Sequence, residues 1–318
     1  MRIHFLAAAF LGVAASGTLA QSYPTKPIRV VIPYAPAGGV DRMGRLMAQP
    51  LAAALGQPVI IENQGGAATM IGTSMVARAA PDGHTLLFTT NGFSVNVLVQ
   101  KNSSYKLDEF VAVAPVAVFG YVFVVSPDMP ARTVQEFIAY AKKEPAKVNA
   151  GAVGAGSAMH LLNERFETLA GITVPDVHYR GLAPALTDLM GGQVQMLFDT
   201  IGTSARQVKG GKVRALAVTS PERSPLIPDV PTFREAGLGG MTQLGWQGVF
   251  APIGTPNAVV DRLNREIVTI ASSAEIRAHF DPEGLSPLDL SREAFAKFVR
   301  DDAAPWERIV KALGIKAD

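Results

Sequence analysis

The residues with the clearest chemical potential lie in a glycine loop near the N-terminus. The β-branched run Ile28–Ile32 predicts a buried strand, the loop 36–39 (PAGG) follows it, and apolar periodicity predicts a helix from about Asp41. Such a loop leaves unpaired backbone N–H groups at the helix N-terminus, and the helix dipole adds a partial positive charge. This pattern predicts an anion site built from backbone amides.

Asp41 leaves two interpretations open. In the first, the loop is an ordinary tight turn and Asp41 caps the helix. In the second, Asp41 caps the helix while the neighbouring N–H groups face a ligand. Because its carboxylate would repel an anion on the helix axis, we expect the ligand at the preceding loop amides.

A second glycine loop, residues 151–157 (GAVGAGS), also lies between a predicted strand and a predicted helix. Met159 stands where a dinucleotide-binding loop needs its third glycine, so NAD binding is not expected. Two anion-friendly helix ends in two separate sheets would face each other across a cleft. Ligands of α/β proteins bind in such places.

Ser157 and His160 suggest a hydrolase pair, but their geometry is poor. A spacing of three on a helix does not aim the hydroxyl at the imidazole, and the chain has no G-x-S-x-G elbow. The five histidines show no metal-ligand spacing, and there is no cysteine. We therefore expect no catalysis, no cofactor and no metal.

Two charged residues follow predicted strands at the edge where α/β sheets hold ligands. Asp199 comes directly after the predicted strand 194–198, and either meets a ligand or caps the next turn. Arg180 follows Tyr179, and either pairs with a carboxylate or makes a surface ion pair. The sequence leaves both choices open.

Composition excludes several classes of protein. The chain has 318 residues, 48% hydrophobic and 18% charged, with a net charge of +2, which predicts large α/β cores without nucleic-acid or membrane-surface binding. Residues 1–20 resemble a secretory signal peptide: Arg2 precedes the apolar run 5–13, and Ala20 ends a small-residue cleavage site. We expect an exported, soluble protein that stands without disulfides.

Strand and helix patterns alternate along most of the chain, which is typical of βαβ units. The predicted strands are 28–32, 59–61, 85–90, 111–125, 147–150, 174–179, 194–198, 213–219 and 246–251. The predicted helices begin near residues 41, 71, 133, 158, 183, 256 and 292, with Thr133, Ser157, Thr255 and Ser291 as N-caps.

Seven segments in order carry a resemblance over nearly the whole mature chain. They read YPTKPIRVVIPYAPAGGVD, ALGQPVIIENQGGA, AAPDGHTLLFTTN, VNAGAVGAGSAMHL, YRGLAPALTDLMGGQVQMLFD, WQGVFAPIGTPNAVVDRLN and WERIVKALGI. Together they resemble the Bug-type, or TctC-like, extracytoplasmic solute-binding proteins of tripartite tricarboxylate transporters.

The resemblance implies an α/β, two-domain type II periplasmic-binding-protein (Venus flytrap) fold, with two Rossmann-like domains of mixed sheets around an interdomain cleft. The expected domains are 21–123 with 250–318, and 124–249. The implied function is a periplasmic, monomeric receptor that binds a small organic acid for membrane transporter subunits. The alternatives are a sensor that serves a two-component kinase without transport, and an exported hydrolase.

The resemblance also implies that loop amides, hydroxyls and waters hold the ligand, with few ionic pairs. The positions that match the family's contacts are Pro36, Ala37, Gly38, Gly39, Asp41, Ala67, Thr69, Thr90, Asn91, Gly154, Gly156, Ser157, Gly181, Leu182, Ala183 and Asp199. Val40 replaces a common hydroxyl residue, and Phe93 is bulky near the expected cleft. These departures hint at a ligand more apolar than a short amino acid or a tricarboxylate.

Overall fold

The computed structural model describes residues 23–100, 102–153, 156–179 and 181–314. The expected signal peptide, Gly154 and Arg180 lie outside these residues. None of the helices within the described ranges has the length and apolar character needed to cross a membrane.

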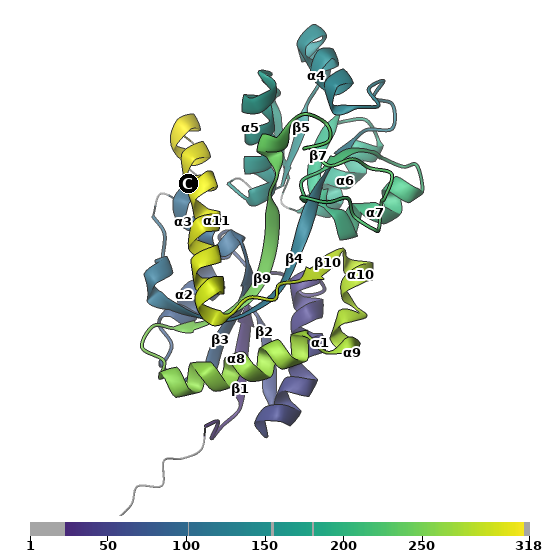
Figure 1. Cartoon of the computed structure of the whole chain (residues 1–318). Coiled ribbons are helices and arrows are strands. Elements are labelled where there is room, and N and C mark those ends of the chain that lie inside the picture. Colours follow the sequence, from purple (N-terminus) through teal and green to yellow (C-terminus); the bar gives the residue numbers. More distant parts are fainter. Residues whose placement is uncertain (1–22, 101, 154–155, 180, 315–318) are drawn as a thin grey trace, which may run out of the picture.

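The chain alternates strands and helices (Figure 1). The strands are β1 (Ile28–Ile32), β2 (Val59–Asn63), β3 (Thr85–Thr90), β4 (Phe110–Val125), β5 (Ala150–Val153), β6 (Asp176–Tyr179), β7 (Met196–Thr200), β8 (Arg214–Val218), β9 (Leu244–Pro252) and β10 (Leu285–Pro287). The helices are α1 (Gly39–Leu55), α2 (Met70–Ala77), α3 (Gly92–Val99), α4 (Val134–Lys143), α5 (Ala158–Ala170), α6 (Leu182–Met190), α7 (Ile201–Lys209), α8 (Asn257–Ala271), α9 (Ala274–Arg277), α10 (Phe280–Glu283) and α11 (Arg292–Leu313).

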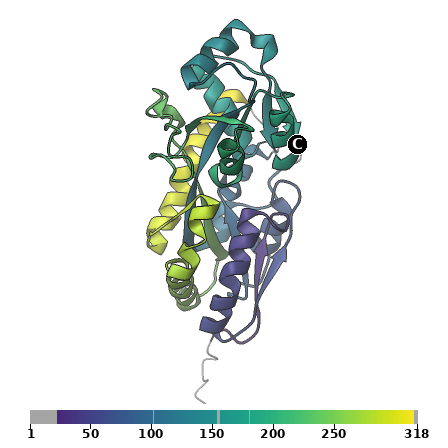
Figure 2. The ribbon, with the colours of Figure 1, turned by 90° about the vertical axis from the view of Figure 1, so that its right-hand side faces the viewer.

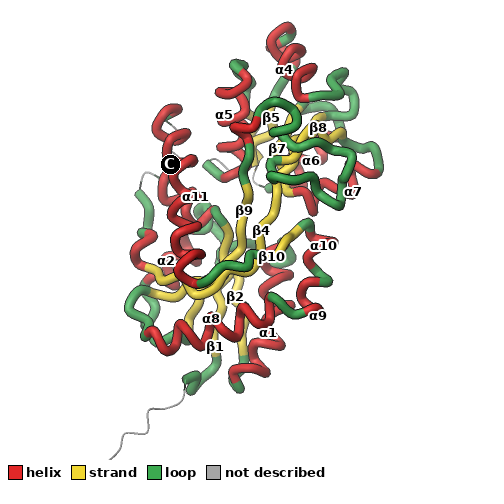
Figure 3. Tube along the Cα trace, viewed as in Figure 1, coloured by secondary structure: helices red, strands yellow, loops and turns green. Residues whose placement is uncertain are grey.

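The strands form two lobes that share the long strand β4. In the lower lobe of Figure 1 the order is β2-β1-β3-β9-β4, and residues 110–120 of β4 pair antiparallel with β9. In the upper lobe residues 121–125 of β4 pair with β7 and β8, and β5 and β6 extend the sheet. Both parts mix parallel and antiparallel pairs. Figure 3 shows β4 and β9 running through the middle of the molecule.

Each lobe has an aromatic core. Phe123, Phe166 and Phe198 are fully buried in the upper lobe, where Phe123 packs against the other two rings with centroids 4.7 and 5.1 Å away. In the lower lobe Trp246 packs edge-on against Phe295. Phe93 also belongs to this lower core and is only 1% exposed, so it is not a bulky residue at a cleft.

Helix α11 contacts both lobes. Phe295, near its start, belongs to the lower core, whereas Trp306 lies in the core built around Phe123 and is fully buried. Figure 2 shows this yellow helix running from the lower lobe toward the upper one. The C-terminal segment therefore ties the two lobes together.

Most predicted elements match the structure, and the differences have local causes. β1 and β3 have the predicted bounds, and Thr133, Ser157 and Ser291 cap their helices through their side-chain oxygens. The predicted strand 147–150 is wrong, because residues 145–147 form a 3₁₀ turn and β5 begins at Ala150. Thr255 is not the cap of α8; Pro256 holds that position, and the Thr255 hydroxyl donates to the Pro252 carbonyl.

Candidate functional site

A cavity of about 440 Å³ lies between the lobes, a size usual for small-molecule sites. Both lobes supply its walls. Tyr34, Asn91 and Gln247 come from the lower lobe, and Ser157 and Leu182 come from the upper one. The predicted cleft between two glycine-loop units is therefore present.

Six helices bring their N-terminal residues to this cavity, three from each lobe. The lining residues at these ends are Gly39 and Val40 of α1, Thr69 before α2, Asn91 and Gly92 at α3, Ser157 and Ala158 at α5, Leu182 of α6, and Thr200 and Thr203 at α7. Each helix end offers N–H donors and a partial positive charge. Their convergence makes the cavity suited to an anion.

In five of these six helices the side chain of the N-cap residue makes no hydrogen bond to the first N–H groups. At the N-cap position α5 has Ser157, whose hydroxyl accepts from the N–H of His160 at 3.3 Å. The other N-cap residues are Gly38, Thr69, Asn91, Gly181 and Thr200, and none of them makes a side-chain cap bond in the described chain. At α3 the N–H of Gly92 donates to the Thr90 hydroxyl at 3.3 Å, and at α2 the N–H of Met70 donates to the Ala67 carbonyl at 3.0 Å. Backbone donors at helix ends without such bonds are available to a bound molecule.

The Asp41 side chain holds the first glycine loop in place by a hydrogen bond and is only 3% exposed. The interpretation of Asp41 as N-cap is wrong: Gly38 is the N-cap, and the Asp41 carboxylate reaches back to accept from the N–H of Ala37 at 2.8 Å. Burial opposes charge on Asp41, but the bonds from Arg45 and Ala37 outweigh it and lower its pKa. Gly39 lines the cavity, whereas Pro36, Ala37, Gly38 and Asp41 do not.

The loop before α2 carries strained backbone. Ala67, Ala68 and Thr69 have positive φ angles of 44°, 49° and 72°, a conformation that L-residues adopt at a cost and that concentrates at functional sites. The buried Asn96 amide holds this turn by donating to the Ala68 carbonyl at 2.5 Å and to the Thr69 hydroxyl at 2.9 Å. Thr69 lines the cavity and Ala67 does not.

The end of β3 supplies Thr90 and Asn91 as predicted, and two tyrosines orient them. The Tyr34 hydroxyl lies 2.8 Å from the Thr90 hydroxyl, and burial raises the pKa of Tyr34, which keeps that phenol protonated. The Tyr121 hydroxyl donates to Asn91 Oδ1 at 3.2 Å. Both tyrosines line the cavity, and neither was predicted to do so.

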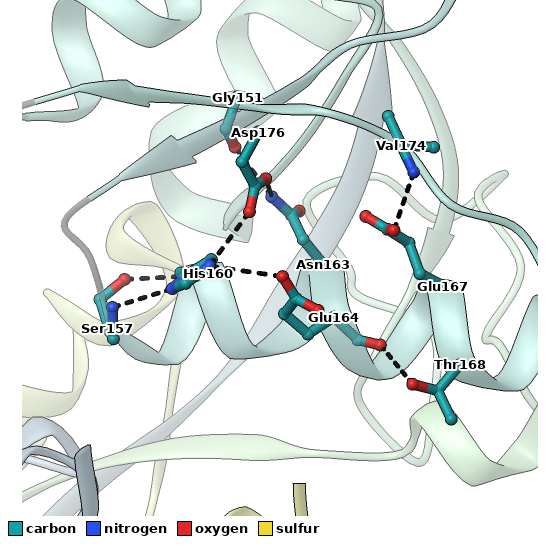
Figure 4. Close-up of polar contacts among 10 residues, drawn as sticks. Gly151, Ser157, His160, Asn163, Glu164, Glu167, Thr168, Val174 and Asp176 are labelled. Atoms are coloured by element: carbon teal, nitrogen blue, oxygen red, sulfur yellow. Dashed lines mark hydrogen bonds and ion pairs between the residues drawn. The ribbon is translucent and has the colours of Figure 1, made fainter. Parts of the chain in front are cut away.

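In the second glycine loop, His160 holds the backbone in place and does not activate Ser157 (Figure 4). The N–H of Gly156 donates to His160 Nδ1 at 2.8 Å, and Nε2 lies 3.0 Å from a carboxylate oxygen of Asp176. Both ring nitrogens are thus engaged, and Ser157 Oγ accepts from the His160 backbone N–H. This arrangement provides no free base for a serine nucleophile.

His160, Asp176 and His178 lie close enough for a metal, with potential ligand atoms within 4.8 Å of one another. Sequence spacing did not reveal this group. A metal-bound histidine normally donates its other ring N–H to an acceptor. Here Nδ1 of His160 instead accepts the N–H of Gly156, so the group does not fit a metal centre.

Of the remaining predicted residues, one lines the cavity and the others do not. Leu182 lines the cavity, whereas Gly156, Gly181, Ala183 and Asp199 do not. Asp199 lies inside β7 rather than after it and is fully buried, accepting from the Ser204 hydroxyl and the N–H of Thr200. Burial raises its pKa to about 7 despite those two bonds.

The cavity wall carries one ion pair among its described residues. Arg42 Nε donates to Glu283 Oε1 at 2.9 Å, and both side chains line the cavity. Because the two charges neutralise each other, the anion preference rests on the helix ends and on neutral polar groups. Arg42, Glu283, Asn96 and Gln247 were not anticipated from sequence.

Two lobes with a cavity at their junction define a solute-binding protein of the two-domain periplasmic class. A structure titled MatC from Rhodopseudomonas palustris with bound malate is 31% identical, with a TM-score of 0.81 over 91% of this chain and 100% of that one. An R. palustris protein solved with adipate is 32% identical, with a TM-score of 0.83 over 92% and 99%. The expected fold class is confirmed.

The family follows from the sequence comparisons. Residues 43–315 match the tripartite tricarboxylate transporter family receptor, TctC. Protein BugT of Bordetella pertussis is 33% identical over 308 residues, covering 96% of this chain and 94% of that protein. The chain belongs to the TctC family of receptors, and the resemblance drawn from its motifs is confirmed.

Proposed function

We propose that this protein is a periplasmic receptor that binds a small carboxylate in the cavity between its lobes and performs no chemistry on it. The observation that carries the proposal is the convergence of six helix N-termini on that cavity, five of them without a hydrogen bond from the N-cap side chain. The malate and adipate bound by two similar proteins fit the same chemistry.

The amide donors favour an anionic ligand by a margin that can be measured. Each helix end contributes roughly 0.3–1 kcal/mol, and each hydrogen bond to a charged acceptor about 1.5–3 kcal/mol. A carboxylate should therefore bind tens to hundreds of times more tightly than its primary amide. Calorimetric titration with malate, adipate and the corresponding amides tests this. Equal affinities for acid and amide would show that the helix ends do not recognise the anionic group.

The family of the chain suggests the membrane proteins with which this receptor works. We infer that the receptor acts as a monomer, with two domains that divide near the expected bounds 123/124 and 249/250, and delivers its ligand to membrane subunits of a tripartite tricarboxylate transporter. Export would use residues 1–20. Cells that lack the gene should no longer take up the identified acid. If these cells still take up the acid but no longer change transcription in response to it, the sensor-kinase alternative is favoured.

A further inference from the structure

The cavity wall has an apolar part that the convergence of helix ends does not explain. Phe119 of β4 and Leu285 of β10 are partners across antiparallel strands, and such partners point to the same face. Both line the cavity, and Val40, Met159 and Leu182 add further apolar side chains to its wall. All of these except Leu285 are only half-buried, so a bound molecule can remove their remaining surface from water.

The apolar part of the wall is continuous with the polar part along β4. Phe119 and Tyr121 are two residues apart on one face of this strand, and their rings meet edge-to-face with centroids 5.4 Å apart. The Tyr121 hydroxyl in turn donates to Asn91, the N-cap residue of α3. A molecule that extends along β4 from the polar part therefore places its far end against Phe119 and Leu285.

Among the described lining residues the charged side chains are Arg42 and Glu283, and each is committed to the other. The Nε and Nη2 atoms of Arg42 donate to the two carboxylate oxygens of Glu283, and Nη1 donates to the Ala37 carbonyl at 2.7 Å. A second carboxylate on the ligand would therefore find no free cation, and an ammonium group would find no free carboxylate. Burying either charge without a partner is unfavourable.

The hydroxyl groups of the wall also bond within the chain. The Tyr34 hydroxyl pairs with that of Thr90 at 2.8 Å, and the Thr200 hydroxyl pairs with that of Thr203 at 2.8 Å. The anion donors of the cavity are therefore mainly the backbone amides of its helix ends. The side chains of Phe119 and Leu285 offer no donor, so the ligand surface that faces them must be apolar.

We propose that the ligand is a monocarboxylate with an apolar body, whose carboxylate lies at the helix ends and whose body packs on Phe119 and Leu285. This inference rests on the proposed carboxylate-binding function and names the class of acid. That class differs from malate and adipate, the acids bound by two similar proteins, because each of those carries a carboxylate at both ends.

The test compares acids that differ by one carboxylate, by calorimetry on the mature protein. Hexanoate with adipate is a flexible pair, and benzoate with terephthalate is a rigid pair. In the pair that fits the cavity, we expect the monocarboxylate to bind at least tenfold more tightly than the dicarboxylate. The reason is that the second carboxylate would leave water for a wall without a cation.

Met159→Gln tests the apolar wall directly. Glutamine keeps the length of methionine and places an NH₂ donor on the wall, where a second carboxylate can accept from it. The preference for the monocarboxylate should therefore shrink severalfold. Met190→Gln is the matched control, because Met190 is also half-buried but lies at the far end of α6 and does not line the cavity. This variant should keep the wild-type ratio.

Wild-type protein that shows no preference for the monocarboxylate in either pair, or that binds malate but neither monocarboxylate, would overturn the proposal whether or not the variants fold. An unchanged ratio in folded Met159→Gln would also overturn it. Protein that binds no carboxylate at all would instead overturn the proposed function.

Discussion

Among single residues, Asp199 links the folding of the upper lobe to pH. Its folded pKa of about 7 exceeds the ordinary value of 3.8, because the carboxyl is buried in β7. The folded state therefore binds the proton more tightly than the unfolded chain does. This stabilisation is fully present below pH 3.8 and is lost as pH rises through 7, with a slope of at most about 1.4 kcal/mol per pH unit.

We expect Asp199→Asn to remove this contribution. The amide mimics the protonated carboxyl: its oxygen accepts from the Thr200 N–H, and its NH₂ can donate to the Ser204 hydroxyl. The variant should gain stability relative to wild type between pH 4.5 and 7. Urea denaturation at several pH values measures this difference, and a constant difference would contradict it. Glu167 and Asp302 also have raised pKa values, so only the difference between the proteins isolates Asp199.

The sequence predicted those cavity residues that lie at the N-terminal end of a helix, because their place at the cavity follows from the local strand-loop-helix pattern. Thr69, Asn91 and Ser157 precede helices, and a strand-loop-helix pattern is visible in a single chain segment. Gln247 and Tyr121 were not predicted, because they sit within strands and reach the cavity only through pairing with distant segments. The roles given to Asp41 and Asp199 could not be decided, because hydrogen-bond partners determine which way a carboxylate points.

At the scale of elements, the close approach of α5 to α3 depends on Gly156. Its φ is +76°, and a Cβ there would lie 2.3 Å from Cγ1 of Val99 at the end of α3. Gly156→Ala should therefore destabilise the protein by about 1–3 kcal/mol through overpacking, with added backbone strain. It should also weaken ligand binding, because the Ser157 end of α5 would shift at the cavity.

A double-mutant cycle with Val99→Ala separates these two effects. Removing the Val99 methyl groups relieves the collision but leaves the positive φ, so the double variant should recover part of the loss. Urea denaturation of the four proteins gives the coupling free energy. If the stability losses of the two single variants simply add in the double variant, the requirement for glycine at position 156 does not come from contact with Val99 of α3. By contrast Gly38 has a φ of −73° and room for a Cβ, so that position does not require glycine.

For the whole molecule, the contact between α7 and α10 brings the upper lobe against the lower one beside the cavity. A Cβ on Gly202 of α7 would lie 2.1 Å from the backbone oxygen of Glu283 in α10. Glu283 in turn holds Arg42 of α1 at the cavity wall. Only a glycine at position 202 allows the two backbones to approach this closely, so this contact sets how far the lobes close.

We expect Gly202→Ala to hold the lobes apart and reduce ligand affinity about tenfold or more, while the separate cores stay folded. Alanine favours helix over glycine by about 1 kcal/mol, so a loss cannot come from the intrinsic stability of α7. Calorimetry measures the affinity, and X-ray scattering with saturating ligand should show a larger radius of gyration than wild type. Gly239→Ala, where the nearest atom is 3.8 Å away, is the control. Wild-type affinity and compactness in Gly202→Ala would mean that the α7–α10 contact does not limit closure.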